Sequence, residues 1–307
     1  SISFVASANC GIYCGARVDF IDIDPITWNI SIDKLKHKLI YAKTHNKLPK
    51  IIVVVHLSGL PCDLAEIYKL SKEYGFYVIE DACHAIGSRY NNNNIGSCKY
   101  SDITVFSFHP VKVMTTGEGG MATTNIINLA NKMRILRTHG ITRDPDLMTH
   151  DPDGEWYYQQ IDLGFNYRMT DIAAALGISQ LLRLDSNIKK RHEIVRFYNK
   201  ALSSLPLMLP YSDVSRYSSC HLYIVRIKNK KKLYSEIFEL LTNFGIGVNK
   251  HYIPIHTQPF YKNFGFKSGD FPESESYYRE AISLPIFPDL TKKEQESVIS
   301  AVSKALE

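Results

Sequence analysis

Three short polar clusters in the sequence contain the side chains that can do chemistry. They are residues 56–59, 81–84 and 107–112, and each follows a run of apolar, mostly β-branched or aromatic residues. Such runs are typical of strands buried on both faces of a parallel sheet. Because ligands of open α/β sheets bind at the carboxyl ends of the strands, we expect the three clusters to meet in one crevice.

Asp81 and Lys112 have the clearest chemical use. An acid at the end of an apolar strand is poorly solvated and needs a cationic partner. For Asp81 a protonated pyridine nitrogen is one candidate, and capping of a turn or helix is the alternative. A lysine in a partly buried crevice can act as an amine nucleophile and form a Schiff base with the aldehyde of pyridoxal phosphate (PLP). Lys112 fits that use, with an ordinary surface lysine as the alternative, and Ser107 is placed to donate a hydrogen bond to a phosphate.

The rest of the sequence predicts the elements that position these residues. Apolar residues at helical spacing predict helices over 32–42, 63–74, 126–139, 170–184, 187–202, 233–244 and 292–306. Further strands are expected over 17–23, 222–227 and 246–251, residues 2–6 are strand-like, and the asparagines at 91–94 indicate a hairpin turn. This alternation predicts an α/β fold with a mixed sheet flanked by helices. Pro206 and Pro210 interrupt the chain, so we expect a large domain over 1–205 and a small C-terminal α+β domain over 206–307.

Composition narrows the class of protein. The 307 residues are 45% apolar and 22% charged, with a net charge of +5 carried by scattered lysines, which favours neither nucleic-acid binding nor a membrane partner. No stretch of about 18 apolar residues or signal peptide is present, so we expect a cytoplasmic protein. The six cysteines form no CxxC pair and no zinc-like spacing, so reduced thiols and no metal site are expected.

Several motifs, in order and spacing, resemble the DegT/StrS family of sugar aminotransferases. They are EDACHAIG at 80–87, FSFHPVK at 106–112, TGEGG at 116–120, LGFNYRMTD at 163–171, AAALG at 173–177, HYIP at 251–254 and LPIFP at 284–288. Together they cover essentially the whole chain. Within the family, SCKYSD at 97–102, HGI at 139–141 and WYY at 156–158 look most like the branch that makes the 4-amino sugar precursor of pseudaminic acid.

The resemblance implies fold type I of the PLP-dependent aminotransferases and a role for each matching residue. Lys112 holds the cofactor and later moves a proton as the catalytic base. The cofactor-binding residues would be Asp81 at the pyridine nitrogen, His84 near O3′ or the ring, Ser107 at the phosphate and Phe4 stacked on the ring, with His251 and Tyr252 near the substrate. Asn166 would reach the phosphate of a neighbouring subunit's cofactor, which implies a homodimer with shared active sites. Structural packing is the alternative for His84, His251 and Tyr252, and core burial is the alternative for Phe4.

The implied reaction transfers an amino group from glutamate to C4 of a 4-keto-6-deoxy nucleotide sugar, of the UDP-4-amino-4,6-dideoxy-N-acetyl-altrosamine type. Two other interpretations stay open. PLP-dependent sugar dehydratases of similar fold tend to have His where Lys112 stands, so the lysine argues against them. Family members also carry a Gly-Thr phosphate-binding motif ahead of the segment that corresponds to 2–9, and these 307 residues contain no counterpart. A chain of this length is expected to bind the cofactor less tightly, and a truncated non-catalytic paralogue is the other alternative.

Overall fold

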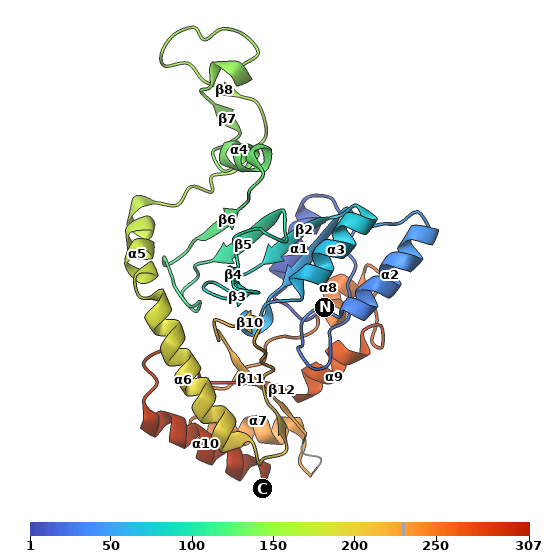
Figure 1. Ribbon diagram of the computed structural model, residues 1–307, viewed down its shortest axis with the longest axis vertical. Coiled ribbons are helices and arrows are strands. Elements are labelled where there is room, and N and C mark those ends of the chain that lie inside the picture. Colours follow the sequence, from blue (N-terminus) through green and yellow to red (C-terminus); the bar gives the residue numbers. More distant parts are fainter. Residues whose placement is uncertain (229–230) are drawn as a thin grey trace.

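A four-stranded mixed sheet forms the centre of the larger part of the molecule. The computed structural model describes residues 1–228 and 231–307. The strands are β1 (Ile51–Val55), β2 (Tyr77–Asp81), β5 (Ile103–Ser107) and β6 (Gly120–Thr123), in the order β1-β2-β5-β6. The first three are parallel and β6 is antiparallel to β5. Asp81 pairs with Val55 on one side and Val105 on the other, so the polar clusters that follow the three strands share one edge of the sheet (Figure 1).

Helices α2 (Ile32–Thr44) and α3 (Leu64–Tyr74) cover one face of this sheet. Their apolar stripes pack on the buried residues of the strands and form a core that includes Leu35, Leu39, Val54, Ile67, Leu70 and Val78. Gly75 ends α3 in the left-handed conformation, with φ 75°, which a glycine adopts without strain. A hairpin of β3 (Arg89–Tyr90) and β4 (Asn93–Asn94) turns through Asn91 and Asn92, both at positive φ, as the asparagine run predicts. Strand β10 (Arg216–Tyr217) extends this hairpin.

The C-terminal part has its own antiparallel sheet. Strands β12 (Ala281–Leu284), β11 (Tyr223–Ile227) and β9 (Leu207–Met208) lie in that order, covered by α7 (Tyr234–Asn243) and α10 (Lys292–Leu306). The long helix α6 (Leu184–Leu202) serves both parts: Leu184 and Ile188 pack on Val113, whereas its C-terminal half enters the core under β11. Packing therefore crosses residue 205, and the domain boundary there stays a prediction.

Three sequence predictions of strands are wrong. Residues 2–6 are not a strand but lead into helix α1 (Ala6–Tyr13), where the amide of Asn9 already bonds to the carbonyl of Val5. Residues 17–23 and 246–251 make only the isolated bridges Ile23–Ile30 and Asn249–Ser283. In these segments, tight turns and side-chain hydrogen bonds satisfy the backbone. A pattern of apolar residues reveals neither of them.

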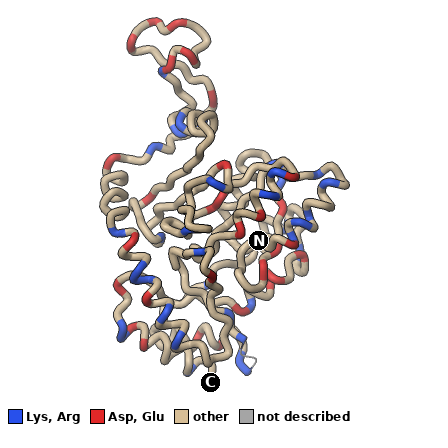
Figure 2. Tube along the Cα trace, viewed as in Figure 1, with Lys and Arg blue, Asp and Glu red and all other residues tan. Residues whose placement is uncertain are grey.

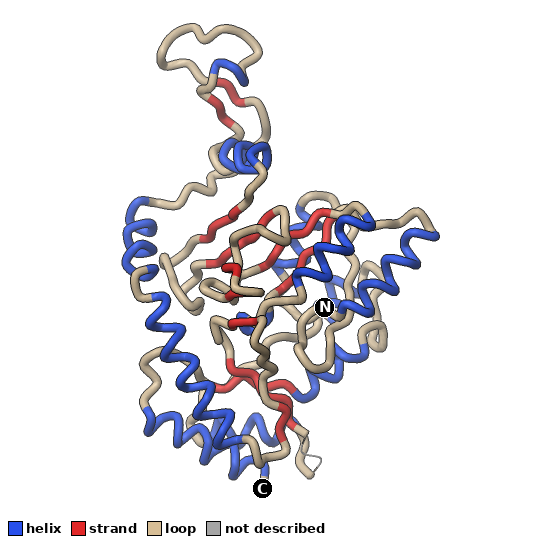
Figure 3. Tube along the Cα trace, in the orientation of Figure 1, coloured by secondary structure: helices blue, strands red, loops and turns tan. Residues whose placement is uncertain are grey.

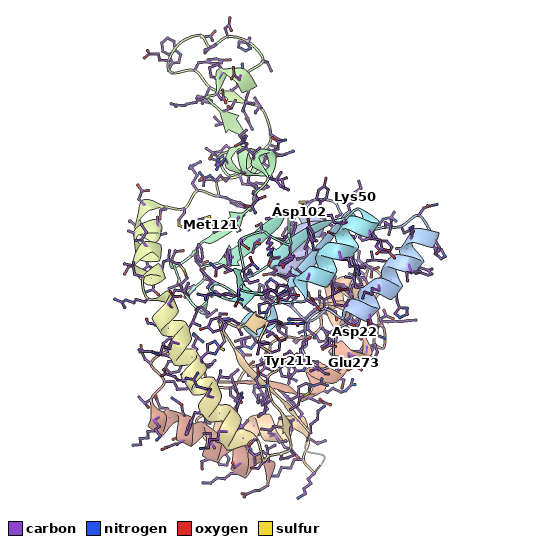
Figure 4. All side chains as sticks on the ribbon, viewed as in Figure 1. Asp22, Lys50, Asp102, Met121, Tyr211 and Glu273 are labelled. Carbon is purple, nitrogen blue, oxygen red and sulfur yellow. The ribbon has the colours of Figure 1, made fainter. Side chains whose placement is uncertain are left out.

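Asp22 shows how the 17–23 segment is held instead. Its carboxylate accepts hydrogen bonds from the amides of Glu273 and Ser274, each at 2.9 Å, in the first turn of α9 (Pro272–Glu280). Figure 4 shows Asp22 and Glu273 side by side. The short helix α8 (Pro259–Lys262) precedes α9 and packs through Tyr261 on Phe20. The N-terminal segment is thereby attached to the C-terminal one.

An arm projects from the sheet between β6 and α5 (Figures 1 and 3). It contains α4 (Ile127–Leu136), β7 (Ile141–Thr142) and β8 (Gln159–Gln160), and α5 (Asp171–Leu181) leads back from it to α6. At its base a Cβ on Gly140 would lie 1.8 Å from the carbonyl oxygen of Asp162, so only glycine fits. No helix among the described residues is long and apolar enough to cross a membrane.

Candidate active site

The loop after β5 holds Lys112 in a fixed, half-buried position. The amide of Lys112 bonds to the carbonyl of His109 at 2.9 Å, and the carbonyl of Phe108 accepts from the amide of Thr116 at 3.0 Å, which closes the loop. The next two side chains, Val113 and Met114, are buried. The backbone of Lys112 is thus fixed between these anchors, and its side chain is half-buried. Burial lowers the pKa of Lys112, and the nearby Cys83 and Asp81 partly oppose that shift. An amine of this kind is more nucleophilic at neutral pH than a solvated lysine.

Asp81 lies at the end of β2 and is oriented by two donors. Ser7 on α1 donates from its hydroxyl to Oδ2 at 2.5 Å, and the amide of Cys83 donates to Oδ1 at 3.1 Å. The Asp81 charge acts on Lys112, so the structure brings the two predicted residues into one site. The Cys83 thiol lies beside both; burial raises its pKa, and Asp81 adds to that shift. Because the Cys83 thiol stays neutral, Asp81 is the carboxylate that faces Lys112 in this site.

His84, Tyr252 and Phe4 form an aromatic wall of this site. Nε2 of His84 and the hydroxyl of Tyr252 are 3.0 Å apart, and the ring of Phe4 lies 6.2 Å from that of Tyr252. Phe4 is 60% exposed, so the alternative of core burial is wrong. An exposed aromatic ring beside the site remains available to stack on a flat ligand.

His251 also faces Lys112. Its Nδ1 lies 2.8 Å from the hydroxyl of Ser283. Burial lowers its pKa to about 4, with a further contribution from the charge of Lys112. At neutral pH this ring is therefore uncharged and can serve as a hydrogen-bonding group, but not as a fixed positive charge.

Ser107 and Asn166 differ in where the structure puts them. Ser107 ends β5, two residues beyond the pairing partner of Asp81, and its hydroxyl accepts only a long bond of 3.4 Å from the amide of His109. It is at the edge that carries the site. Asn166 is exposed at the root of the arm, where it bridges to Thr138. No contact joins it to Lys112 or Asp81 among the described residues, and its role at the phosphate of a neighbouring subunit's cofactor stays a prediction.

The residues present fit PLP by one further observation. Nδ1 of His84 is buried and has no hydrogen-bond partner among the described residues. Burial lowers the pKa of His84 well below its ordinary value, and Lys112 and His251 add to the shift. A neutral imidazole with a free buried nitrogen can accept a hydrogen bond from a polar atom of a bound molecule or donate one to it. A cofactor oxygen next to the amine of Lys112 would be such an atom.

Sequence reasoning missed two contributors. Sequence patterns did not indicate Ser7, because it lies 74 residues before Asp81 and directly after the strand-like segment 2–6. His221, which packs its ring 4.5 Å from the ring of His84, precedes a predicted strand and matched no quoted motif. The only sequence signal for His221 is its position as a polar residue directly before the predicted strand 222–227.

Three relatives illustrate what the chain is similar to. It is 36% identical to the UDP-4-amino-4,6-dideoxy-N-acetyl-beta-L-altrosamine transaminase of Campylobacter jejuni, over 100% of this chain and 78% of the relative. Helicobacter pylori PseC, an aminotransferase of pseudaminic acid biosynthesis, superimposes with a TM-score of 0.89 at 30% identity, over 99% of this chain and 78% of the other. A Streptococcus pneumoniae protein solved in a PLP form superimposes with a TM-score of 0.85 at 27% identity, over 100% of this chain and 80% of the other.

These likenesses confirm the predicted fold class, and the matching family model confirms the predicted enzyme class. The model of the DegT/DnrJ/EryC1/StrS aminotransferase family matches residues 1–303. The residues around Lys112 that carried the resemblance all lie within that match. The chain belongs to the DegT/DnrJ/EryC1/StrS aminotransferase family.

Proposed function

We propose that the protein is a PLP-dependent enzyme that transfers an amino group from glutamate to C4 of a 4-keto-6-deoxy nucleotide sugar. The product is of the UDP-4-amino-4,6-dideoxy-N-acetyl-altrosamine type, used for surface glycans such as those built on pseudaminic acid. The observation that carries the proposal is the half-buried amine of Lys112 beside the carboxylate of Asp81. The named activities of the Campylobacter jejuni relative and of PseC support the choice of substrate.

The residues have separate tasks in this reaction. When bound, PLP supplies an aldehyde for the amino group and a ring that accepts electrons from the reacting carbon. Lys112 would hold the aldehyde of PLP until the amino group of glutamate displaces it, and its freed amine would then move the proton, for which its lowered pKa suits it. Asp81 keeps the pyridine nitrogen protonated. Overall, glutamate loses its amino group and becomes 2-oxoglutarate, while the ketone at C4 of the sugar becomes an amine.

The remaining predicted residues surround these two. Ser107 binds the phosphate of the cofactor, Phe4 stacks on its ring and His84 contacts its ring oxygen. His251 and Tyr252 face the sugar. The exposed ring of Phe4 and the unpartnered Nδ1 of His84 support the assignments on the cofactor side.

We propose a homodimer with shared active sites, in which Asn166 of one subunit reaches the cofactor phosphate of the other. Helix α5 supports this: apart from Gly177, none of its residues is buried, although Ile172, Ile178 and Leu181 are 86%, 66% and 55% exposed. A helix that is apolar on every side needs a covering surface. A second copy of the chain covers it in the proposed assembly. A cytoplasmic location fits the six free cysteines.

Borohydride reduction tests the cofactor assignment without relying on activity. The protein is mixed with PLP, reduced and digested, and the peptides are analysed by mass spectrometry. We expect the cofactor mass on Lys112 and the loss of the visible Schiff-base absorbance in Lys112→Ala. Lys99→Ala, an exposed loop lysine, is the matched control and should label like the wild type. Label at other lysines with none on Lys112 would contradict the assignment.

Amino transfer is tested separately. With ¹⁵N-glutamate as donor and a UDP-linked 4-keto-6-deoxy sugar as acceptor, we expect ¹⁵N at C4 of the product sugar and one 2-oxoglutarate for each amino sugar formed. Loss of a sugar hydroxyl without uptake of ¹⁵N would instead identify a dehydratase. A covalent label on Lys112 without either product would support a non-catalytic paralogue.

A further inference from the structure

His221 enters the site on a backbone that is fixed from two sides. It lies just before β11, its amide donates to the carbonyl of Ser58 at 2.9 Å, and its carbonyl accepts from Nη1 of Arg191 at 3.2 Å. Ser58 belongs to the loop after β1, and Arg191 is buried in α6. The loop, the helix and the C-terminal sheet thus meet at this residue, so the place of its ring is set by all three.

The ring of His221 packs directly on that of His84. Their centroids are 4.5 Å apart, with the planes tilted by 44°, and His221 is only 6% exposed. Tyr252 is the other neighbour of His84: its hydroxyl meets Nε2 at 3.0 Å and the two rings stack at 6.0 Å. His84 therefore packs between two rings: Tyr252, which shares a hydrogen bond with it, and His221, which makes only a ring contact.

The imidazole of His221 is uncharged and poorly satisfied. Burial lowers its pKa well below the ordinary value, and the neighbouring basic groups of His84, Lys112, Arg191 and His251 shift it in the same direction. Its Nδ1 has no hydrogen-bond partner among the described residues. No metal explains the arrangement, because no group of three or more His, Cys, Asp or Glu in this part of the chain is placed to hold one.

A buried nitrogen without a hydrogen-bond partner is destabilising, and an apolar side chain of similar size avoids that cost. If His221 only filled space, leucine would do so with a gain in stability. Residues that break a packing rule in this way are concentrated at functional sites. The ring that His221 supports is that of His84, whose own Nδ1 has no hydrogen-bond partner among the described residues.

We propose that His221 is a positioning residue for the cofactor site: it holds the ring of His84 in the orientation in which its free nitrogen meets the bound cofactor. The inference rests on the proposed function, because it takes PLP as the molecule that His84 contacts. It adds a residue from the segment before β11 to the cofactor site, whose proposed cofactor contacts, Asp81, His84, Ser107, Lys112 and Phe4, otherwise all lie in the N-terminal half of the chain.

The experiment compares melting temperatures without and with saturating PLP, together with PLP titrations followed by absorbance. His221→Leu should melt at or above the wild-type temperature without PLP, but its increase on adding PLP should shrink and its PLP affinity should fall about tenfold. His221→Asn keeps a polar atom near the position of Nδ1. It should restore part of the PLP-induced increase in melting temperature and part of the PLP affinity. His256→Leu is the control: His256 is also fully buried with an unpartnered Nδ1, but it packs on Phe271 and its Nε2 lies 3.1 Å from a carboxylate oxygen of Glu275.

Because leucine loses the hydrogen bond with Glu275, we expect His256→Leu to melt lower in both states, with the increase due to PLP unchanged. A His221→Leu protein that retains the full PLP-induced increase and affinity would overturn the inference, and so would an equal loss of stability in both states. In either case the label on Lys112 would still stand, so the proposed function would survive. A wild-type protein that shows neither a PLP-induced increase nor a label on Lys112 would end both proposals.

Discussion

At the scale of the residue, strand β2 carries two adjacent acids with opposite tasks. Asp81 faces the site, and Glu80 is buried on the other side at 2% exposure. Glu80 accepts hydrogen bonds from His56 at 2.8 Å, from Thr104 at 2.9 Å and from the hydroxyl of Ser101. Period-two alternation explains both positions: one carboxylate is satisfied inside the protein, and the other is left for a ligand.

Glu80→Gln should lower the free energy of unfolding by about 3 kcal/mol at pH 7. Nδ1 of His56 accepts from the amide of Cys62, so its Nε2 carries the proton that Glu80 accepts. A glutamine either turns its NH₂ group toward this donor or loses the bonds from Ser101 and Thr104. Urea denaturation measures the change, with the exposed Glu239→Gln as control.

The same residue predicts a pH dependence. Burial acts to raise the pKa of Glu80, but the hydrogen bonds from His56, Ser101 and Thr104 hold it below the ordinary value of 4.5. A lowered pKa in the folded state gives stability that is present above about pH 4.5 and is lost as the pH falls through the folded value. The difference between wild type and Glu80→Gln should therefore shrink below pH 4.5. A difference that stays constant down to pH 3 would contradict this account.

At the scale of the element, Asp22 serves as the cap of a helix far away in sequence. Helix α9 has no side-chain cap from its own N-cap residue, Phe271. Asp22 supplies it through the amides of Glu273 and Ser274 and the hydroxyl of Ser274. A carboxylate at a helix N-terminus also interacts favourably with the helix dipole.

Asp22→Ala should cost about 2 kcal/mol in free energy of unfolding, because it leaves amide donors of α9 without a partner. Asp22→Asn retains one acceptor oxygen and should lose less. Asp33→Ala, in the exposed first turn of α2, removes an acid that caps nothing and is the control. Chemical denaturation measures all three, and equal losses for Asp22→Ala and Asp33→Ala would show that α9 does not depend on this cap.

Local signals predicted most elements of the fold, and long-range ones accounted for the errors. Continuous β-branched runs indicated β1 and β5, and Gly75 indicated the end of α3. The short strands β6, β9 and β12 were missed because their pairing depends on partners 13 or more residues away rather than on their own composition. For the same reason the edge that gathers Asp81 and Lys112 was predictable from strand ends, but Ser7 and His221 were not.

At the scale of the whole molecule, the arm and α5 form a surface that a single chain leaves uncovered. Trp156, Leu163 and Tyr167 on the arm are 74%, 81% and 73% exposed, and Leu182 after α5 is 85% exposed. The tip of the arm carries acidic side chains, which suits contact with water (Figure 2). Large apolar patches on a soluble protein mark interfaces, and a stable dimer needs about 800 Å² from each partner.

Ile172→Glu, on α5, should therefore convert a dimer into a monomer. A carboxylate placed in an apolar interface is desolvated without a partner, which costs several kcal/mol for each copy. Ile40→Glu on α2 is the matched control, because that isoleucine is also exposed, at 55% against 86% for Ile172, but lies on the other side of the sheet from the arm. Sedimentation velocity at micromolar concentration should show wild type and Ile40→Glu as dimers and Ile172→Glu as a monomer.

The same experiment separates assembly from the site. If Asn166 of one subunit completes the phosphate site of the other, the Ile172→Glu monomer should bind PLP more weakly, whereas Asn166→Ala should bind it more weakly and stay dimeric. Both effects follow from one geometry, because the arm that exposes the apolar surface also carries Asn166. If the wild type were a monomer and bound PLP as tightly as any variant, both the shared cofactor site and the dimer interface over α5 would be contradicted.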